Sequence, residues 1–115
     1  MSFLTPGKKN LITDVKGLYI GNSENELINT GSTILTCEDR FVASYKVLGG
    51  APGTRETDLL EPDKLVEKID ALVLSGGSAF GLEAASETVN LLRRDNKGYS
   101  VSNTKVPIVP SAIIF

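Results

Sequence analysis

The stretch LVLSGGSAFGLEAASETVNLL, residues 72–92, decides the local fold because its hydrophobic period changes in the middle. It begins in a run of four apolar residues, Ala71–Leu74, which is typical of a buried strand. After Gly76–Ser78 the apolar residues follow at helical spacing and line one face: Leu82, Ala85, Val89 and Leu92. The polar residues at 83, 87, 90 and 94 fall on the opposite face. We therefore predict a strand, a tight turn and a helix that ends at Asp95–Gly98, where a glycine can take the left-handed conformation.

The Gly76–Ser78 turn fits no common catalytic motif. A nucleophile elbow reads Gly-x-Ser-x-Gly, and here Gly81 comes one residue too late after Ser78. Neither the dinucleotide pattern Gly-x-Gly-x-x-Gly nor a terminal Gly-Lys-Ser/Thr is present. Two interpretations remain open. Ser78 can cap the helix by accepting a backbone N–H, worth about 1 kcal/mol, or the free N–H groups of the helix start can face an anion or a carbonyl oxygen.

Composition removes several classes of function. The 115 residues suit one domain or part of one, and a net charge of −2 gives no basic footprint for nucleic acid. With no histidine, a Ser-His-Asp triad cannot be assembled within the chain, and zinc loses its commonest ligand. Cys37 is the only cysteine, so an internal disulfide is impossible. We expect a cytoplasmic protein without membrane segment, metal or cofactor, and we place Cys37 where a strand ends at a turn.

The clearest β pattern lies in residues 31–48. Residues 31–37 and 41–48 form two runs rich in β-branched and aromatic residues, and the second alternates with a period of two. Glu38–Arg40 between them can form a hairpin loop. We therefore predict an antiparallel pair of these two runs. Residues 18–20 are expected to be extended, and 22–29 a connecting loop.

Three further segments complete the expected structure. Residues 49–62 are rich in glycine and proline and predict a surface loop or the wall of a cleft. Pro62 and Asp63 favour the first turn of a short helix whose apolar stripe is Leu65, Val66 and Ile69. Ser111–Phe115 reads as a buried strand. Because chain ends are usually polar and exposed, the apolar end predicts further polypeptide after Phe115, so that residues 1–115 form a single incomplete domain.

Three motifs in order carry a resemblance to a known family. They are GGAPGTRETDLL (residues 49–60), ALVLSGGSAFGLEAA (residues 71–85) and VPIVPSAIIF (residues 106–115). They resemble successive motifs of the DmpA-type peptidases, which include L-aminopeptidase/D-esterases, β-peptidyl aminopeptidases and nylon-oligomer hydrolases. The NLITDVKGLYIGN and TGSTILT stretches also look like the N-terminal part of that family, so the resemblance runs from about Asn10 to Phe115.

The resemblance implies an α+β fold that is part of a four-layer αββα sandwich similar to the N-terminal-nucleophile hydrolases. It also implies a precursor that cleaves itself before a Ser or Thr, whose hydroxyl then attacks an amide or ester carbonyl. The freed α-amino group can act as the local base, so this chemistry needs no histidine, metal or cofactor. In the family the nucleophile lies downstream of the IIF-type motif, so the catalytic residues are expected beyond residue 115 and this chain alone is expected to be inactive.

The resemblance also implies a substrate-binding wall made by Ser78, Ala79, Phe80 and Phe115. Phe115 falls where some relatives carry tyrosine, but phenylalanine cannot donate a hydrogen bond. For Arg55, Glu56 and Asp58 it implies a structural loop or a subunit contact. The implied partners are a peptide, amino-acid amide or ester substrate, the remaining C-terminal polypeptide of the same enzyme, and further copies in a homo-oligomer. Two alternatives stay open: a non-catalytic binding or assembly module that retains half the scaffold, and an unrelated small α/β ligand-binding domain.

Overall fold

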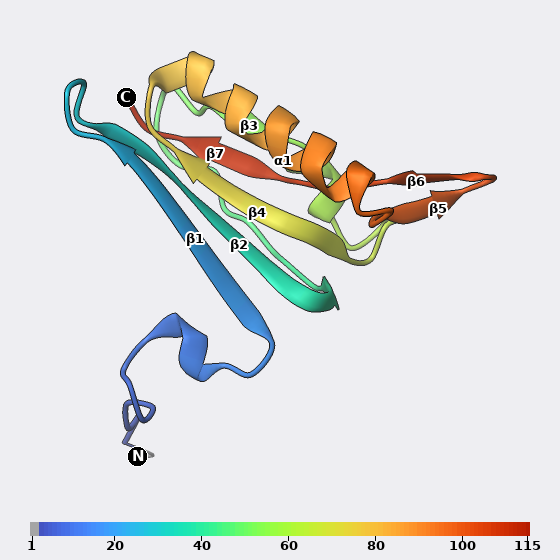
Figure 1. Ribbon diagram of the computed structural model, residues 1–115, viewed down its shortest axis with the longest axis horizontal. Coiled ribbons are helices and arrows are strands. Elements are labelled where there is room, and N and C mark those ends of the chain that lie inside the picture. Colours follow the sequence, from blue (N-terminus) through green and yellow to red (C-terminus); the bar gives the residue numbers. More distant parts are fainter. Residues whose placement is uncertain (1–2) are drawn as a thin grey trace.

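A computed structural model describes residues 3–115, and its centre is a five-stranded mixed sheet with one helix (Figure 1). The strand order is β1-β2-β4-β7-β3. The strands are β1 (Leu18–Asn25), β2 (Thr30–Phe41), β4 (Ile69–Ser75), β7 (Ser111–Ile113) and β3 (Thr54–Arg55). A separate hairpin joins β5 (Tyr99–Val101) to β6 (Thr104–Val106), and the helix is α1 (Glu83–Arg94). Short 3₁₀ turns cover Ile12–Asp14, Asp58–Leu60 and Ser78–Leu82.

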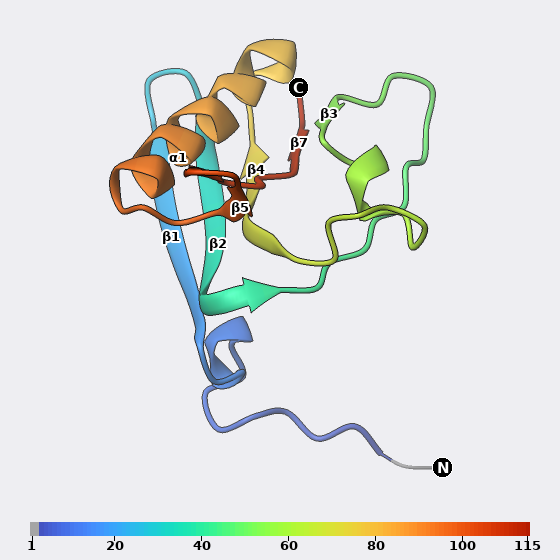
Figure 2. The same ribbon diagram turned by 90° about the vertical axis from the view of Figure 1, so that its right-hand side faces the viewer.

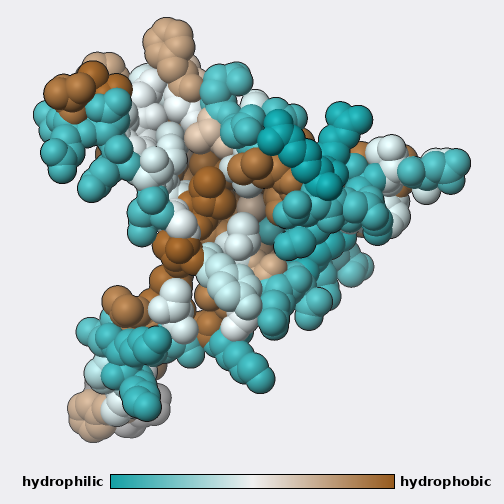
Figure 3. Space-filling view, viewed as in Figure 1, coloured by the Kyte–Doolittle hydropathy of each residue, from teal (hydrophilic) through white to brown (hydrophobic). Residues whose placement is uncertain are grey.

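The strand–turn–helix prediction is confirmed by β4 and α1. The buried core joins Ala71 and Val73 of β4 to Ala85 and Leu92 of α1, with Val109 beside them. The predicted polar face of the helix is exposed at all four positions, 83, 87, 90 and 94. Figure 3 shows apolar side chains gathered between the β1–β2 hairpin and α1, whereas the outer side of α1 is hydrophilic. The helix therefore covers one face of the sheet by burying its predicted stripe.

The opposite face of the sheet has no helix over it within residues 3–115 (Figure 2). Because strand side chains alternate, Leu72 and Leu74 point away from α1, and Leu74 is 51% exposed. The register places Leu35 of β2 opposite Leu72, so apolar residues continue across strands on this face. The long segment 42–68 reaches out on this side of the sheet (Figure 2).

The predicted antiparallel pair is wrong in its partners. β2 runs through residues 38–41 without turning, with a register shift between Thr36 and Phe41, and residues 42–48 form no strand. Its partner is β1, which pairs from Leu18↔Cys37 to Asn25↔Thr30. The predicted loop 22–29 is therefore half strand, and Cys37 lies inside a strand rather than at its end. An edge strand can be polar on both faces, which is why the second half of β1, residues 22–25, lacks an apolar signal.

Two other segments differ from the prediction. Residues 61–68 form turns rather than a helix, and Leu65 is 92% exposed, because no apolar surface lies beside it to bury a helical stripe. The final strand is present, but it ends at Ile113, and Ile114 and Phe115 are exposed rather than buried. No helix within the described residues is long and apolar enough to cross a membrane.

An ion pair between the buried Asp70 and the partly exposed Arg40 holds the amino end of β4. Asp70 Oδ1 lies 3.2 Å from Arg40 Nε and forms an ion pair with it. The Nε–H of Arg40 is not aligned for a hydrogen bond. Its Oδ2 accepts the backbone N–H of Ile108 at 2.9 Å. The Arg40 guanidinium also lies 5.4 Å from the centre of the Tyr99 ring. Both carboxylate oxygens thus have partners, as a buried charge requires.

Candidate functional site

The turn between β4 and α1 is fixed by backbone hydrogen bonds to β2 and to the segment after β7. Gly77 and Ser78 both take left-handed conformations, with φ of 88° and 55°. The Gly76 N–H donates to Gly31 O at 2.8 Å, and the Ser78 N–H donates to Ile114 O at 3.0 Å. The turn is therefore attached on one side to the β1–β2 hairpin and on the other to the segment after β7.

Small residues are required because backbone segments approach closely here. A Cβ at Gly81 would lie 2.1 Å from Gly76 O, which no real side chain tolerates. At Gly77 the left-handed conformation itself favours glycine. Gly81 therefore permits the close approach of the Gly76 backbone and of the Ile113 side chain.

Ser78 does not cap the helix. Gly77 precedes the 3₁₀ turn Ser78–Leu82, which has no side-chain cap, and α1 proper begins only at Glu83 without one. With its own φ at 55°, Ser78 lacks the extended backbone that an N-cap residue normally has. The Ser78 N–H donates to Ile114 O, so this N–H is not free to bind an anion or a carbonyl oxygen of a ligand.

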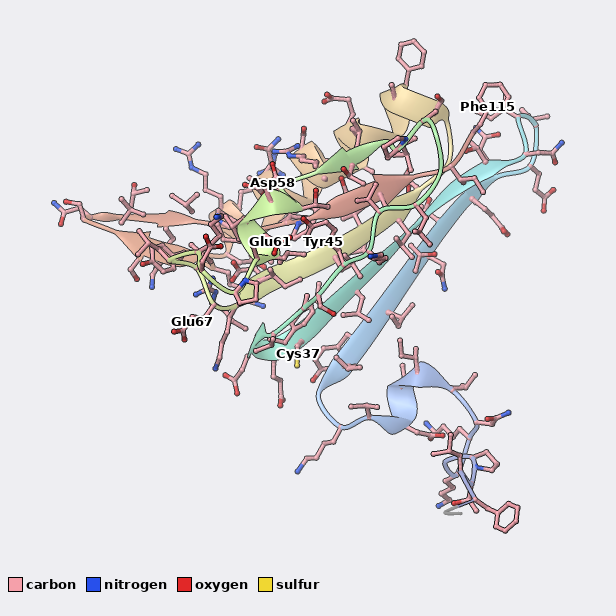
Figure 4. The ribbon with its side chains drawn as sticks, turned by 180° about the vertical axis from the view of Figure 1, so that it is seen from behind. Cys37, Tyr45, Asp58, Glu61, Glu67 and Phe115 are labelled. Atoms are coloured by element: carbon pink, nitrogen blue, oxygen red, sulfur yellow. The ribbon has the colours of Figure 1, made fainter. Side chains whose placement is uncertain are left out.

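An open hollow of about 1150 Å³ lies between this turn and the tip of the β1–β2 hairpin. Three of the four predicted site residues line it together: Ser78, Phe80 and Phe115. Ala79 is exposed beside them and is not part of the lining. Phe80 is 89% exposed and Phe115 fully so, so neither ring serves the core. Figure 4 shows Phe115 projecting beside the hairpin.

The other wall of the hollow was missed by sequence reasoning. It is the hairpin tip, whose lining residues fall in two ranges, 22–26 and 28–31. Asn25 starts the turn by accepting the Leu27 N–H on its side-chain oxygen at 3.1 Å, and Asn29 takes a left-handed φ of 48°. Asparagine is common in turns, so Asn25 and Asn29, four residues apart, were the sequence signal that could have predicted a hairpin turn between β1 and β2.

The hollow offers binding groups rather than a complete reaction centre. Its apolar surface comes from Ile28, Phe80, Ile114 and Phe115, and its charges from Glu24 and Glu26. Thr30 Oγ1 is buried at its edge without a hydrogen-bond partner. Within residues 3–115 the Ser78 hydroxyl has no hydrogen bond to a basic group, and no cluster of three metal-ligating side chains occurs. The geometry suits a ligand with an apolar part and a polar part.

The residues of the Arg55 loop are engaged in packing. Arg55 Nη1 donates to Ser86 Oγ of α1 at 2.7 Å, while Glu56 Oε2 accepts the Val109 N–H at 3.2 Å. Arg55 also lies in β3, which pairs with β7. Asp58 starts a 3₁₀ turn. These contacts hold β3 and its loop against the helix and β7, in keeping with a structural loop.

Comparison of the sequence with known proteins identifies a protein family that it matches. Residues 10–115 match the sequence profile described as Peptidase family S58. An uncharacterized aminopeptidase of Mycobacterium bovis is 40% identical over 114 residues, covering 92% of this chain and 33% of the relative. A relative of the same description from Mycobacterium tuberculosis gives the same values. One from Mycobacterium leprae is 39% identical and is covered over 32% of its length. The chain thus spans about a third of the length of these relatives.

Proposed function

This chain belongs to peptidase family S58, and on that premise we propose that it forms the N-terminal part of a self-processing aminopeptidase or amidohydrolase. The enzyme hydrolyses N-terminal amide, peptide or ester bonds. The name aminopeptidase, which the mycobacterial relatives carry, supports this reaction class. The observation that carries the proposal within the chain is the hollow that joins Ser78, Phe80 and Phe115 beside a turn with no base of its own.

In the proposed reaction the nucleophile is a Ser or Thr beyond residue 115, made the first residue of a second chain by self-cleavage. Its hydroxyl oxygen attacks the substrate carbonyl, and the new α-amino group accepts the hydroxyl proton. The same group returns the proton to the leaving amine or alcohol, and water then hydrolyses the acyl-enzyme. The lack of histidine in residues 1–115 is compatible with a mechanism of this kind, and the relatives are about three times as long as this chain.

Ser78, Phe80 and Phe115 then form one wall of the substrate-binding site. Phe80 and Phe115 offer apolar surface to a substrate side chain, and their exposure is otherwise unfavourable. Ser78 holds the turn in place through its backbone rather than its hydroxyl. At residue 115 a phenylalanine can shape the pocket but cannot donate a hydrogen bond to a developing oxyanion.

The proposed fold of the whole enzyme is the four-layer αββα sandwich. The apolar sheet face away from α1, with Leu74 half exposed, supports a second sheet packed on it. We further propose a cofactor-free, cytoplasmic homo-oligomer, in keeping with a single free cysteine.

The decisive experiment is expression of the complete reading frame, followed by intact mass spectrometry and assays of amine release from aminoacyl amides and esters. We expect two fragments, with the second starting at Ser or Thr, and turnover that survives Ser78→Ala. A single uncleaved chain that releases no amine would favour a non-catalytic assembly module instead. An acyl group trapped on Ser78 would refute the assignment of the nucleophile.

A further inference from the structure

The N-terminal segment, residues 3–16, is an ordered arm that leaves its apolar residues unburied. It extends from the start of β1 away from the sheet (Figures 1 and 2). Five of its side chains are more than half exposed: Phe3, Leu4, Leu11, Ile12 and Val15. Exposed apolar residues gathered on one segment usually mark an interaction site.

Hydrogen bonds within the arm fix its shape. The Asp14 carboxylate accepts the Lys9 N–H at 3.0 Å and the Leu11 N–H at 3.3 Å. The Asn10 N–H donates to Gly7 O at 3.1 Å, and Ile12–Asp14 form a 3₁₀ turn. The conformation is thus set before any partner arrives, which lowers the entropy cost of binding.

The arm carries positive charge on a negatively charged chain. It holds three exposed lysines, Lys8, Lys9 and Lys16, and one acid, Asp14, whose carboxylate is engaged internally. The chain as a whole has a net charge of −2, so the remainder is acidic. A partner for the arm should therefore present acidic side chains next to apolar ones.

Such a surface exists elsewhere on the same chain. Residues 56–67, here called the acidic segment, contain five exposed acidic residues and one lysine: Glu56, Asp58, Glu61, Asp63 and Glu67, with Lys64. Three of the carboxylates already have a contact within the chain, Glu56 with the Val109 N–H, Glu61 with the Tyr45 hydroxyl and Asp63 with Lys64, so Asp58 and Glu67 are the most available to a partner. Leu65 among them is 92% exposed. Figure 4 shows Asp58 and Glu61 in front of the sheet and Glu67 beyond its lower left edge, all three far from the N-terminal arm. The 3₁₀ turn of the arm, Ile12–Asp14, packs mainly against β1.

We propose that the arm of one molecule docks on the acidic segment of a second copy of the chain. Lysines of the arm face the carboxylates, while Ile12 and its neighbours cover Leu65. In a two-fold dimer this contact is made twice, so each substitution acts at two places. The inference names a contact within the proposed homo-oligomer and rests on that proposal, but it does not depend on the proposed reaction.

The test measures self-association of the full chain by sedimentation velocity over a range of protein concentrations. We expect a concentration-dependent dimer or larger oligomer that weakens between about 50 mM and about 500 mM salt, because surface charges are screened. Lys9→Glu should raise the dissociation constant about three- to tenfold, and Ile12→Asp by more than about tenfold. Glu67→Lys should weaken association alone and recover part of it when combined with Lys9→Glu.

The matched control is Lys97→Glu, which makes the same charge change on an exposed lysine outside both surfaces. It should leave association within about twofold of the unsubstituted chain. The proposal is overturned if the chain stays monomeric throughout, or if Lys97→Glu weakens association as much as Lys9→Glu. It is also overturned if Ile12→Asp lowers the unfolding midpoint of a monomer instead, since the arm would then pack within its own polypeptide.

Discussion

The two ends of β4 are built from opposite chemistry. At the amino end Asp70 is buried and both of its carboxylate oxygens have partners, Arg40 and the Ile108 N–H. At the carboxyl end the chain turns through Gly76–Ser78 into an open hollow, where Phe80 and Phe115 have no covering. Polar groups that satisfy one another hold a fold together, whereas apolar groups left exposed have surface available for a ligand. The charged end is therefore the structural one.

The largest effect should come from Asp70→Asn. Removing the carboxylate charge leaves Arg40 without its ion-pair partner, and we expect a loss of about 3 kcal/mol in unfolding free energy. Urea unfolding followed by circular dichroism measures it. Asp39→Asn, at an exposed carboxylate next to Arg40 in the chain, is the control and should change almost nothing. Equal losses of unfolding free energy in the two variants would show that the Asp70–Arg40 ion pair does not stabilise the fold.

Gly81→Ala should be next. The added methyl group would lie 2.1 Å from Gly76 O, and we expect about 2 kcal/mol of destabilisation together with a displaced turn. Urea unfolding gives the energy, and backbone amide shifts of residues 76–81 report the turn. Gly21→Ala, where a Cβ meets nothing within 4 Å, is the matched control. If Gly81→Ala is as stable as Gly21→Ala, the close approach at the turn is not a constraint.

Phe80→Ala should separate binding from stability. Because the ring is 89% exposed, unfolding free energy should change by less than about 0.5 kcal/mol. In the complete enzyme, KM for a phenylalanine or leucine amide should rise about fivefold through lost apolar contact. Leu27→Ala, on an equally exposed residue outside the lining, should leave KM unchanged. A KM unaffected by Phe80→Ala would remove this ring from the substrate wall.

The smallest effect concerns a hydrogen bond that lies at neither end of β4. Tyr45 donates to Glu61 Oε1 at 2.7 Å, and this bond together with the nearby carboxylate raises the tyrosine pKa above 10.0. Because the pKa of Tyr45 is higher in the folded state than its ordinary value of 10.0, the protonated hydroxyl stabilises the fold below pH 10.0. This stabilisation is lost as the pH rises through the pKa of the folded state. Tyrosinate absorbance should show a late transition that moves to lower pH in Glu61→Gln but not in Glu67→Gln. Tyr19→Phe should be present in all samples, since the pKa of Tyr19 is also raised, by Glu38.

The sequence was most informative where a segment is buried on one side. The stripe from Leu82 to Leu92 predicted α1 and its orientation, because a helix packed on a sheet must repeat its apolar residues every three to four positions. Periodicity failed at the two edges. The second half of β1, residues 22–25, is polar and was predicted as part of a loop, whereas residues 18–20 were correctly expected to be extended. Residues 42–48 alternate like a strand yet form none and pair with no strand.

The site was predictable only in part. Ser78, Phe80 and Phe115 were selected by resemblance, and the fold brings them to one hollow. The wall formed by the β1–β2 hairpin depends on a strand pairing that local pattern did not reveal. The capping role of Ser78 depended on its backbone angle, which sequence alone does not specify.

The position of β7 inside the sheet has a consequence for folding during synthesis. β7 lies between β4 and β3, and β3 pairs with no other strand. Until Ser111–Ile113 have left the ribosome, the nascent chain can form only the β1–β2–β4 part, with β3 and the Arg55 loop unattached. The parallel β4–β7 pairing closes a long connection, a slow kind of contact to make. Pausing of translation shortly before these codons should therefore expose an incomplete sheet to chaperones.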